Sequence, residues 1–130
     1  MTTELTLLAW SALLCLLLTF PGIIGLMRIP QGFAWGLGNR DRPMPEVEGW
    51  SARARRAHTN MVENLAPFAA VVLIAHVADR NNAMTALGAQ LFFLGRVAHA
   101  ATYIAGLVPW HTLAFGVAWT GTLLIFLQLL

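Results

Sequence analysis

Long apolar stretches separated by short polar segments make up most of the chain. The stretches at residues 5–27 and 109–130 contain no charged residue, and those at residues 52–78 and 84–107 contain only a few. A helix needs about 20 predominantly apolar residues to cross the hydrocarbon core of a bilayer. The pattern therefore predicts an all-α fold: an integral membrane four-helix bundle with antiparallel, up-and-down topology, in one domain that covers residues 1–130.

Proline and glycine mark the expected interruptions. A Pro-Gly dipeptide at residues 21–22 should kink the first helix near its far end. Prolines and glycines break every periodic pattern in residues 28–51, so this segment is expected to be a loop or a partly re-entrant link. It is either a solvated connector or a segment in which Arg40 and Arg42 act as part of a lid or contact lipid headgroups. Ser51 is expected to cap the second helix.

Two features are expected within the later helices. Pro67 should bend the second helix partway along its length. The last helix carries the small residues Ala114, Ala118 and Gly121, which would let a neighbouring helix pack closely against it. Cys15 is the only cysteine and lies in an apolar run, so no disulfide is expected.

The composition supports a membrane protein and gives it an orientation. Hydrophobic residues make up 58% of the chain and charged residues 11%, whereas a soluble domain carries roughly 25% charged residues. All eight basic residues are Arg, and six of them lie between Arg28 and Arg56, whereas the other side of the bundle offers only Arg80. The positive-inside rule puts the long loop in the cytoplasm and both termini outside it. We expect a multi-pass protein of a bacterial inner membrane that retains its first helix, because Glu4 stands where a signal peptide needs positive charge.

The second and third helices each carry a row of polar side chains. On the second helix, the row follows spacings of about three or four residues: Arg56, Asn60, Glu63 and Asn64. On the third helix, it contains Arg96, His99 and Tyr103. Residues at such spacings lie on one face of an α-helix. Each row is therefore expected to face other helices.

Antiparallel packing brings Glu63 and Arg96 to the same depth. A charged side chain at membrane depth costs several kcal/mol, so it is normally paired, and we predict a buried ion pair between these two residues. The pair could simply fix the register of the two helices. Alternatively, it closes a funnel of hydrogen-bond donors formed by the rest of the two rows, which opens to the cytoplasm and suits a small, anionic, peptide-like ligand.

The other histidines are weaker candidates for chemistry. His76 and His58 are expected to be structural or interfacial, whereas the role of His111, beside the mouth of the funnel, is left open. No cluster of residues has the spacing of a zinc site, so no metal is expected.

The two polar rows also resemble a known family. The pattern Arg53-x-x-Arg56-Ala-x-x-Asn60-x-x-Glu63, followed by Gly95-Arg96-Val-Ala-His99-x-x-x-Tyr103, is similar to that of MAPEG, the membrane-associated proteins in eicosanoid and glutathione metabolism. Within the family it most resembles the microsomal prostaglandin E synthases, and the chain would be a bacterial-type member. The resemblance is strongest over residues 53–112.

The resemblance implies a homotrimer with a glutathione site between neighbouring subunits near the cytoplasmic face. The residues implied to bind glutathione as cofactor are Arg56, Asn60, Glu63, Arg96, His99 and Tyr103. His111 and Thr112 are implied to be catalytic, because His111 aligns with the thiol-activating Arg of the synthases. The implied chemistry is activation of the glutathione thiol toward a lipophilic substrate. Membrane lipid is a further expected partner, and nucleic acid is not.

Departures from the synthase pattern keep other functions open. Thr59 and His111 stand where the synthases carry Arg, and Arg28 does not match the basic end of their first helix. The leading hypothesis is a glutathione-dependent membrane transferase or peroxidase. The alternative is a non-catalytic member that binds lipid or accompanies another membrane complex. A small multidrug-type transporter would need Glu63 to exchange protons, which an ion pair with Arg96 would prevent.

Overall fold

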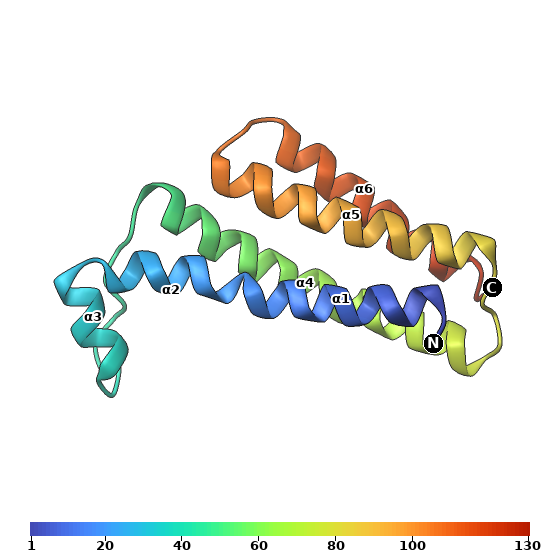
Figure 1. The fold of residues 1–130 in the computed structure, drawn as a ribbon, viewed down its shortest axis with the longest axis horizontal. Helices are drawn as coiled ribbons and strands as arrows, with labels where there is room; N and C mark the ends of the chain where they lie inside the picture. Colours follow the sequence, from blue (N-terminus) through green and yellow to red (C-terminus); the bar gives the residue numbers. More distant parts are fainter.

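The computed structural model describes residues 1–130, which form helices and no strand (Figure 1). The helices are, in chain order, α1 (Thr3–Leu17), α2 (Thr19–Met27), α3 (Pro30–Leu37), α4 (Gly49–Val77), α5 (Ala83–Ala105) and α6 (Trp110–Leu127). Figure 1 shows α1 and α2 as one nearly continuous rod, with α4, α5 and α6 lying along it and both termini at the end opposite α3. The prediction of an all-α fold is confirmed.

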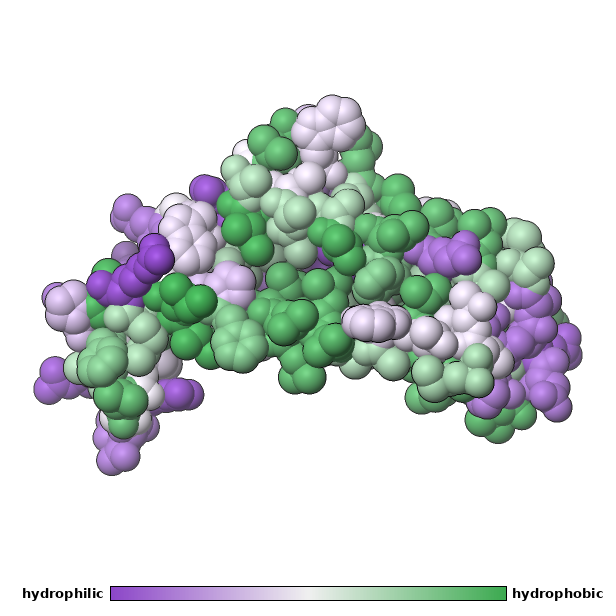
Figure 2. All heavy atoms as spheres, in the orientation of Figure 1, coloured by the Kyte–Doolittle hydropathy of each residue, from purple (hydrophilic) through white to green (hydrophobic).

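Three of these helical segments are long and apolar enough to cross a membrane. They are the continuous stretch Thr3–Met27, then α4 and α6. Helix α5 has 23 residues and is also long enough. It is not among the three because polar residues such as Gln90, Arg96 and His99 lower its mean hydropathy. It packs against α1, α4 and α6, so apolar helices surround much of its polar side. Figure 2 shows apolar residues across the middle of the molecule and polar residues gathered at both ends, which is the pattern of a membrane protein.

The break between α1 and α2 has a local cause. Pro21 has no backbone N–H, so the carbonyl of Leu17 lacks its usual helical donor four residues on. The helix is interrupted at Leu18, whose own N–H still donates to the carbonyl of Leu14 at 2.9 Å. The helix is therefore interrupted one turn before the Pro-Gly dipeptide, and α1 and α2 stay nearly in line (Figure 1).

The segment between the first and second spans contains more structure than expected. We expected a loop or link over residues 28–51, whereas α3 occupies part of it, with Pro30 at the first helical position, where a missing N–H costs nothing. Helix α4 begins at Gly49 with Glu48 as its N-cap. The predicted cap, Ser51, instead lies inside the first turn. Its hydroxyl is buried without a hydrogen-bond partner, directly against Gly25 of α2.

Helix α5 is fixed at both ends. The side chain of Asn82 accepts hydrogen bonds from the backbone of Met84 and Thr85, and Thr85 completes a capping box by accepting from the Asn82 backbone. The hydroxyl of Thr85 also donates to the carboxylate of Glu4, which ties the start of α5 to the start of α1. Gly106 ends the helix with φ 77°, a left-handed conformation that favours glycine.

Helices α5 and α6 approach each other through small residues. A Cβ atom added to Gly95 would lie 2.8 Å from the backbone nitrogen of Ala118 and 3.0 Å from the carbonyl oxygen of Ala114. Gly88 and Gly121 face each other in the same way, backbone against backbone. The prediction that the small residues of the last helix allow close packing is confirmed, and the neighbour is the preceding helix of the same chain.

Candidate functional site

The polar row of α5 points into the protein. Arg96 is 1% exposed and His99 is 3% exposed, and Tyr103 at the end of the row is half-buried. This face of α5 is turned toward α4 and toward the first turns of α6. The prediction that these three side chains face other helices is confirmed.

The guanidinium of Arg96 contacts α4. Its Nη2 donates to Oδ1 of Asn60 at 2.9 Å, and its Nε lies 3.3 Å from Sδ of Met61. The remaining nitrogen, Nη1, is buried and has no hydrogen-bond partner. A buried cation without a carboxylate partner is expensive. Arg96 is therefore the position where the chain most clearly lacks an anion.

The predicted ion pair between Glu63 and Arg96 is wrong within one chain. Glu63 is exposed, and Arg96 bonds Asn60 and Met61 instead. The physical reason lies in the helix geometry. Glu63 lies about 160° round the helix from Met61 and about 60° from Asn60, on the far side of Asn60 from Met61, so it is turned away from the side that Arg96 touches. Equal depth was the wrong criterion, because it ignored which face of α4 meets α5.

The start of α4 is held to the last turn of α5 by an unpredicted contact. Nε of Arg53 donates to the backbone carbonyl of Ile104 at 2.9 Å. A cation at the carboxyl end of a helix is favourable, because the helix dipole is negative there. Arg53 lies seven residues before Asn60, close to two helical turns, so both side chains lie on the α5 side of α4. That spacing was the signal that sequence reasoning missed.

Aromatic and imidazole rings extend the row toward the start of α6. The ring centroids of His99 and Tyr103 are 5.3 Å apart, and those of Tyr103 and His111 are 4.7 Å apart in an edge-on arrangement. Nδ1 of His99 is buried and has no hydrogen-bond partner. Thr112 is exposed, with its hydroxyl 3.4 Å from Nδ1 of His111. The structure thus brings His111 to the predicted site and leaves Thr112 at its edge.

The two other predicted binding residues lie elsewhere. Arg56 and Glu63 are both exposed on the outward face of α4, together with Thr59. The funnel expected from the sequence is therefore divided in one chain. We call the buried part the inner cluster, which consists of Asn60, Arg96, His99, Tyr103 and His111, and the exposed part the outer row, which consists of Arg56, Thr59 and Glu63. None of the main cavities of the chain is lined by Arg96, His99 or Tyr103.

The remaining histidines differ in their surroundings. His76 is exposed near the far end of α4. His58 is half-buried between α4 and α2, with Nε2 3.4 Å from the hydroxyl oxygen of Thr19. Neither contacts the inner cluster.

Comparison with known proteins gives one clear relationship. Searches of curated proteins and of solved structures find no match to the chain. The model of the MAPEG family matches residues 6–130, which is nearly the whole chain and includes every residue of the inner cluster and the outer row. The chain therefore belongs to the MAPEG family.

Proposed function

We propose that the protein is a glutathione-dependent membrane transferase or peroxidase that acts on a lipophilic electrophile. The observation that carries the proposal is the inner cluster, in which a buried guanidinium and a buried imidazole each keep one nitrogen without a partner. Buried polar groups in proteins are nearly always hydrogen-bonded. An unpartnered pair on one helix face, in a MAPEG chain, supports a bound anionic ligand.

The residues present fit glutathione in their chemistry. Glutathione carries two carboxylates, two amides and one ammonium group, so its acceptors outnumber its donors and it is an anion overall. The inner cluster offers mainly donors: Nη1 of Arg96, the imidazole of His99 and the hydroxyl of Tyr103. Arginine binds carboxylates through two parallel hydrogen bonds, which makes Arg96 the natural anchor.

The exposed charges of the outer row favour an assembly in which a second copy of the chain forms part of the glutathione site. Arg56 and Glu63 are exposed on a helix that is apolar enough to span a membrane. Charged groups at membrane depth face protein or water rather than lipid. A homotrimer in which neighbouring subunits cover this face would satisfy that requirement. In such an assembly, the outer row of one subunit would also lie near the inner cluster of a neighbouring subunit. A ligand could then reach both.

The reaction would use a small number of side chains. Bound glutathione would supply a thiol, whose deprotonated form is the competent nucleophile. His111 would accept the thiol proton, since imidazole is the side chain best suited to proton transfer near neutral pH. Thr112 would orient the thiol from beside His111, and the charge of Arg96 would favour the deprotonated form. The exposed apolar surface of α6 would receive the lipophilic substrate.

The proposal is tested by binding and by turnover. Glutathione is titrated at millimolar concentration into the detergent-purified protein by calorimetry, with free cysteine as the control thiol. Conjugation to a generic aromatic electrophile and reduction of a lipid hydroperoxide are then measured. His111→Ala should lower turnover, whereas His76→Ala, which removes an exposed imidazole outside the inner cluster, should not. Absence of saturable binding would remove the proposal.

A second candidate is a non-catalytic member that binds lipid or accompanies another membrane complex. It is favoured by the exposed position of Thr112 and by Thr59 and His111, which replace the Arg residues of the synthase pattern. Stoichiometric co-purification of a partner without turnover would favour it. The free carboxylate of Glu63 also removes an objection to a proton-coupled transporter. Proton release coupled to substrate that persists in Glu63→Gln would exclude that third function.

A further inference from the structure

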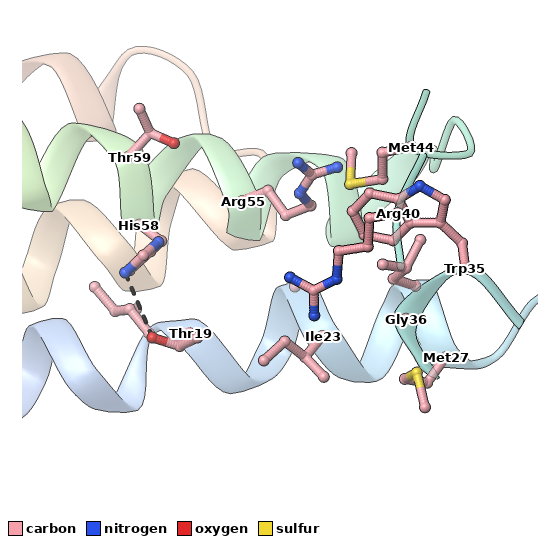
Figure 3. Close-up of a pocket in the computed structure, with 13 residues that line it drawn as sticks. Thr19, Ile23, Met27, Trp35, Gly36, Arg40, Met44, Arg55, His58 and Thr59 are labelled. Carbon is pink, nitrogen blue, oxygen red and sulfur yellow. Dashed lines mark hydrogen bonds between the residues drawn. The ribbon is translucent and has the colours of Figure 1, made fainter. Parts of the chain in front are cut away.

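A cavity of about 400 Å³ lies between α2, α3 and α4, away from the inner cluster (Figure 3). Its apolar wall includes Ile23, Leu26 and Met27 of α2. The cavity is also lined by Trp35 of α3 and by Met44 of the following loop. This volume is in the range of small-molecule sites, which are about 300–1,000 Å³.

The charged residues that line this cavity are all basic. Arg40 and Arg55 line it together with the imidazole of His58, and no carboxylate does. Figure 3 shows the guanidinium group of Arg40 in the space between α2 and α4, and that of Arg55 over α4, on the side of Met44. Two cations that line one cavity repel each other, so an anion bound there would offset that repulsion and gain charge-assisted contacts.

Glycine sets the position of Arg55. A Cβ atom added to Gly22 would lie 2.6 Å from Cγ of Arg55, so the side chain crosses directly over the backbone of α2. Gly22 is buried and Arg55 is half-buried. The stem of Arg55 is thus held against the helix, while its charged end reaches the cavity.

The loop that follows α3 sets the position of Arg40. Arg40 has φ 60°, a left-handed conformation that is uncommon for a residue with a side chain. Its guanidinium lies 5.1 Å from the centre of the Trp35 ring, and Nε1 of Trp35 donates to the carbonyl of Arg42 at 2.7 Å. The hydrogen bond and the ring contact together hold a charged side chain at the rim of the cavity.

The cavity lies where polar and apolar surfaces meet. It is at the arginine-rich end of the molecule, next to the apolar middle in Figure 2. The neighbouring outward side chains of α2 are large, apolar and exposed: Phe20, Ile23 and Ile24. A ligand with a charged head in the cavity would therefore have an apolar surface along which to lay its tail.

We propose that this cavity binds an anionic amphiphile, with a phosphate or carboxylate held between Arg40 and Arg55. His58 and Thr19 supply further hydrogen-bonding groups, and the acyl chain lies along α2 over Ile23. The cavity contains no residue of the inner cluster and shares one residue, Thr59, with the outer row. A membrane phospholipid and a free fatty acid share this chemistry.

The test uses the full-length protein in a neutral detergent with native mass spectrometry. The probes are dioleoyl phosphatidylglycerol, oleate, dioleoyl phosphatidylcholine and inorganic phosphate. We expect saturable binding of the first two at one molecule per chain, and binding of phosphatidylcholine that is about tenfold weaker. The better of the first two probes identifies a phospholipid or a fatty acid as the source. Equal binding of phosphatidylglycerol and phosphatidylcholine would overturn the anionic half of the proposal, and equal binding of inorganic phosphate would overturn the apolar half.

Variants locate the site. Arg55→Gln and Arg40→Gln should each weaken phosphatidylglycerol binding by about tenfold. Arg42→Gln is the matched control, because it removes the same charge from the same loop but does not line the cavity. If the variants do not fold, a photoreactive fatty acid on the wild-type chain gives the answer. Labelling of α2 and Met44 is expected, and labelling confined to α5 and α6 would overturn the proposal.

Discussion

Arginine side chains lie against two sides of α4 in different ways. On the α5 side, the guanidinium of Arg96 is almost fully buried, bonded to Asn60 and left with one unpartnered nitrogen. On the α2 side, Arg55 is half-buried and borders a cavity of about 400 Å³. The first arrangement orients a charge but gives a ligand little room in one chain. The second gives a ligand room but holds the charge by fewer contacts.

This difference assigns different requirements to the two regions. Arg96 needs a change in its surroundings, which a second subunit beside the outer row would provide, before a ligand reaches its free nitrogen. Arg55 needs only an anion from the adjacent membrane surface. We therefore expect glutathione binding to depend on assembly and binding of an anionic amphiphile to persist in a single subunit.

The largest effect is expected from Arg96→Met. Methionine keeps much of the side-chain volume and removes the charge, and replacement of a buried charge by an apolar group is often neutral or stabilising for the fold. Thermal stability should be retained, while glutathione affinity should fall by about tenfold to a hundredfold, since hydrogen bonds to a charged group contribute about 1.5–3 kcal/mol. Calorimetry and a melting curve measure the two effects.

Arg55→Met is the matched control for that change. It removes a guanidinium from the same bundle but leaves the inner cluster intact, so glutathione affinity should not change. If Arg96→Met unfolded the protein and Arg55→Met did not, Arg96 would be a structural residue, and the functional reading of the inner cluster would lose its main support.

Glu63→Gln should weaken assembly. The carboxylate is exposed in one chain at a position that a neighbouring subunit would cover, and loss of its charge removes a partner from that interface. We expect the dissociation constant of the oligomer to rise by about tenfold, the low end of measured charge-pair effects. Mass photometry over a dilution series measures it. Glu46→Gln, in the exposed loop before α4, is the control and should assemble normally.

The sequence was informative where periodicity alone decides the outcome. The spacing of Arg96, His99 and Tyr103 placed all three on one helix face, and the proline and glycine positions gave the helix ends within a few residues. It was misleading where the outcome depends on how two helices are rotated against each other. Depth alone matched Glu63 to Arg96, because a linear pattern does not say which side of α4 meets α5.

The short helix α3 and the basic cavity show a second limit. Residues 28–51 contain so much proline and glycine that their pattern does not predict the helix of eight residues that begins at Pro30. The cavity combines Arg55 and His58 of α4 with Arg40 of the loop after α3. Such a site arises from the tertiary arrangement of α2, α3 and α4, so sequence reasoning reached only a possible headgroup contact of Arg40 and not the residues that share the cavity with it.

A smaller effect is expected from Tyr103→Phe. The ring stays between His99 and His111, so packing and assembly should not change, and only the hydroxyl is lost. Removal of a neutral hydrogen bond to a ligand costs about 0.5–1.5 kcal/mol, which corresponds to a decrease of about two- to tenfold in glutathione affinity. Calorimetry compares the variant with the wild type, and size-exclusion chromatography checks the assembly. A loss of assembly equal to that of Glu63→Gln would contradict a role confined to the ligand.

The smallest effect is expected from Thr112→Val. The hydroxyl of Thr112 is exposed and makes only a long contact, 3.4 Å, with Nδ1 of His111, so its loss should lower turnover by about twofold and leave glutathione affinity unchanged. Initial rates of conjugation at saturating glutathione measure this, with Thr120→Val on the exposed side of α6 as the control. A loss of turnover as large as that of His111→Ala would mean that the Thr112 hydroxyl contributes as much to thiol activation as the imidazole does. The first turn of α6 would then have to lie closer to the ligand in the assembled protein than the single chain indicates.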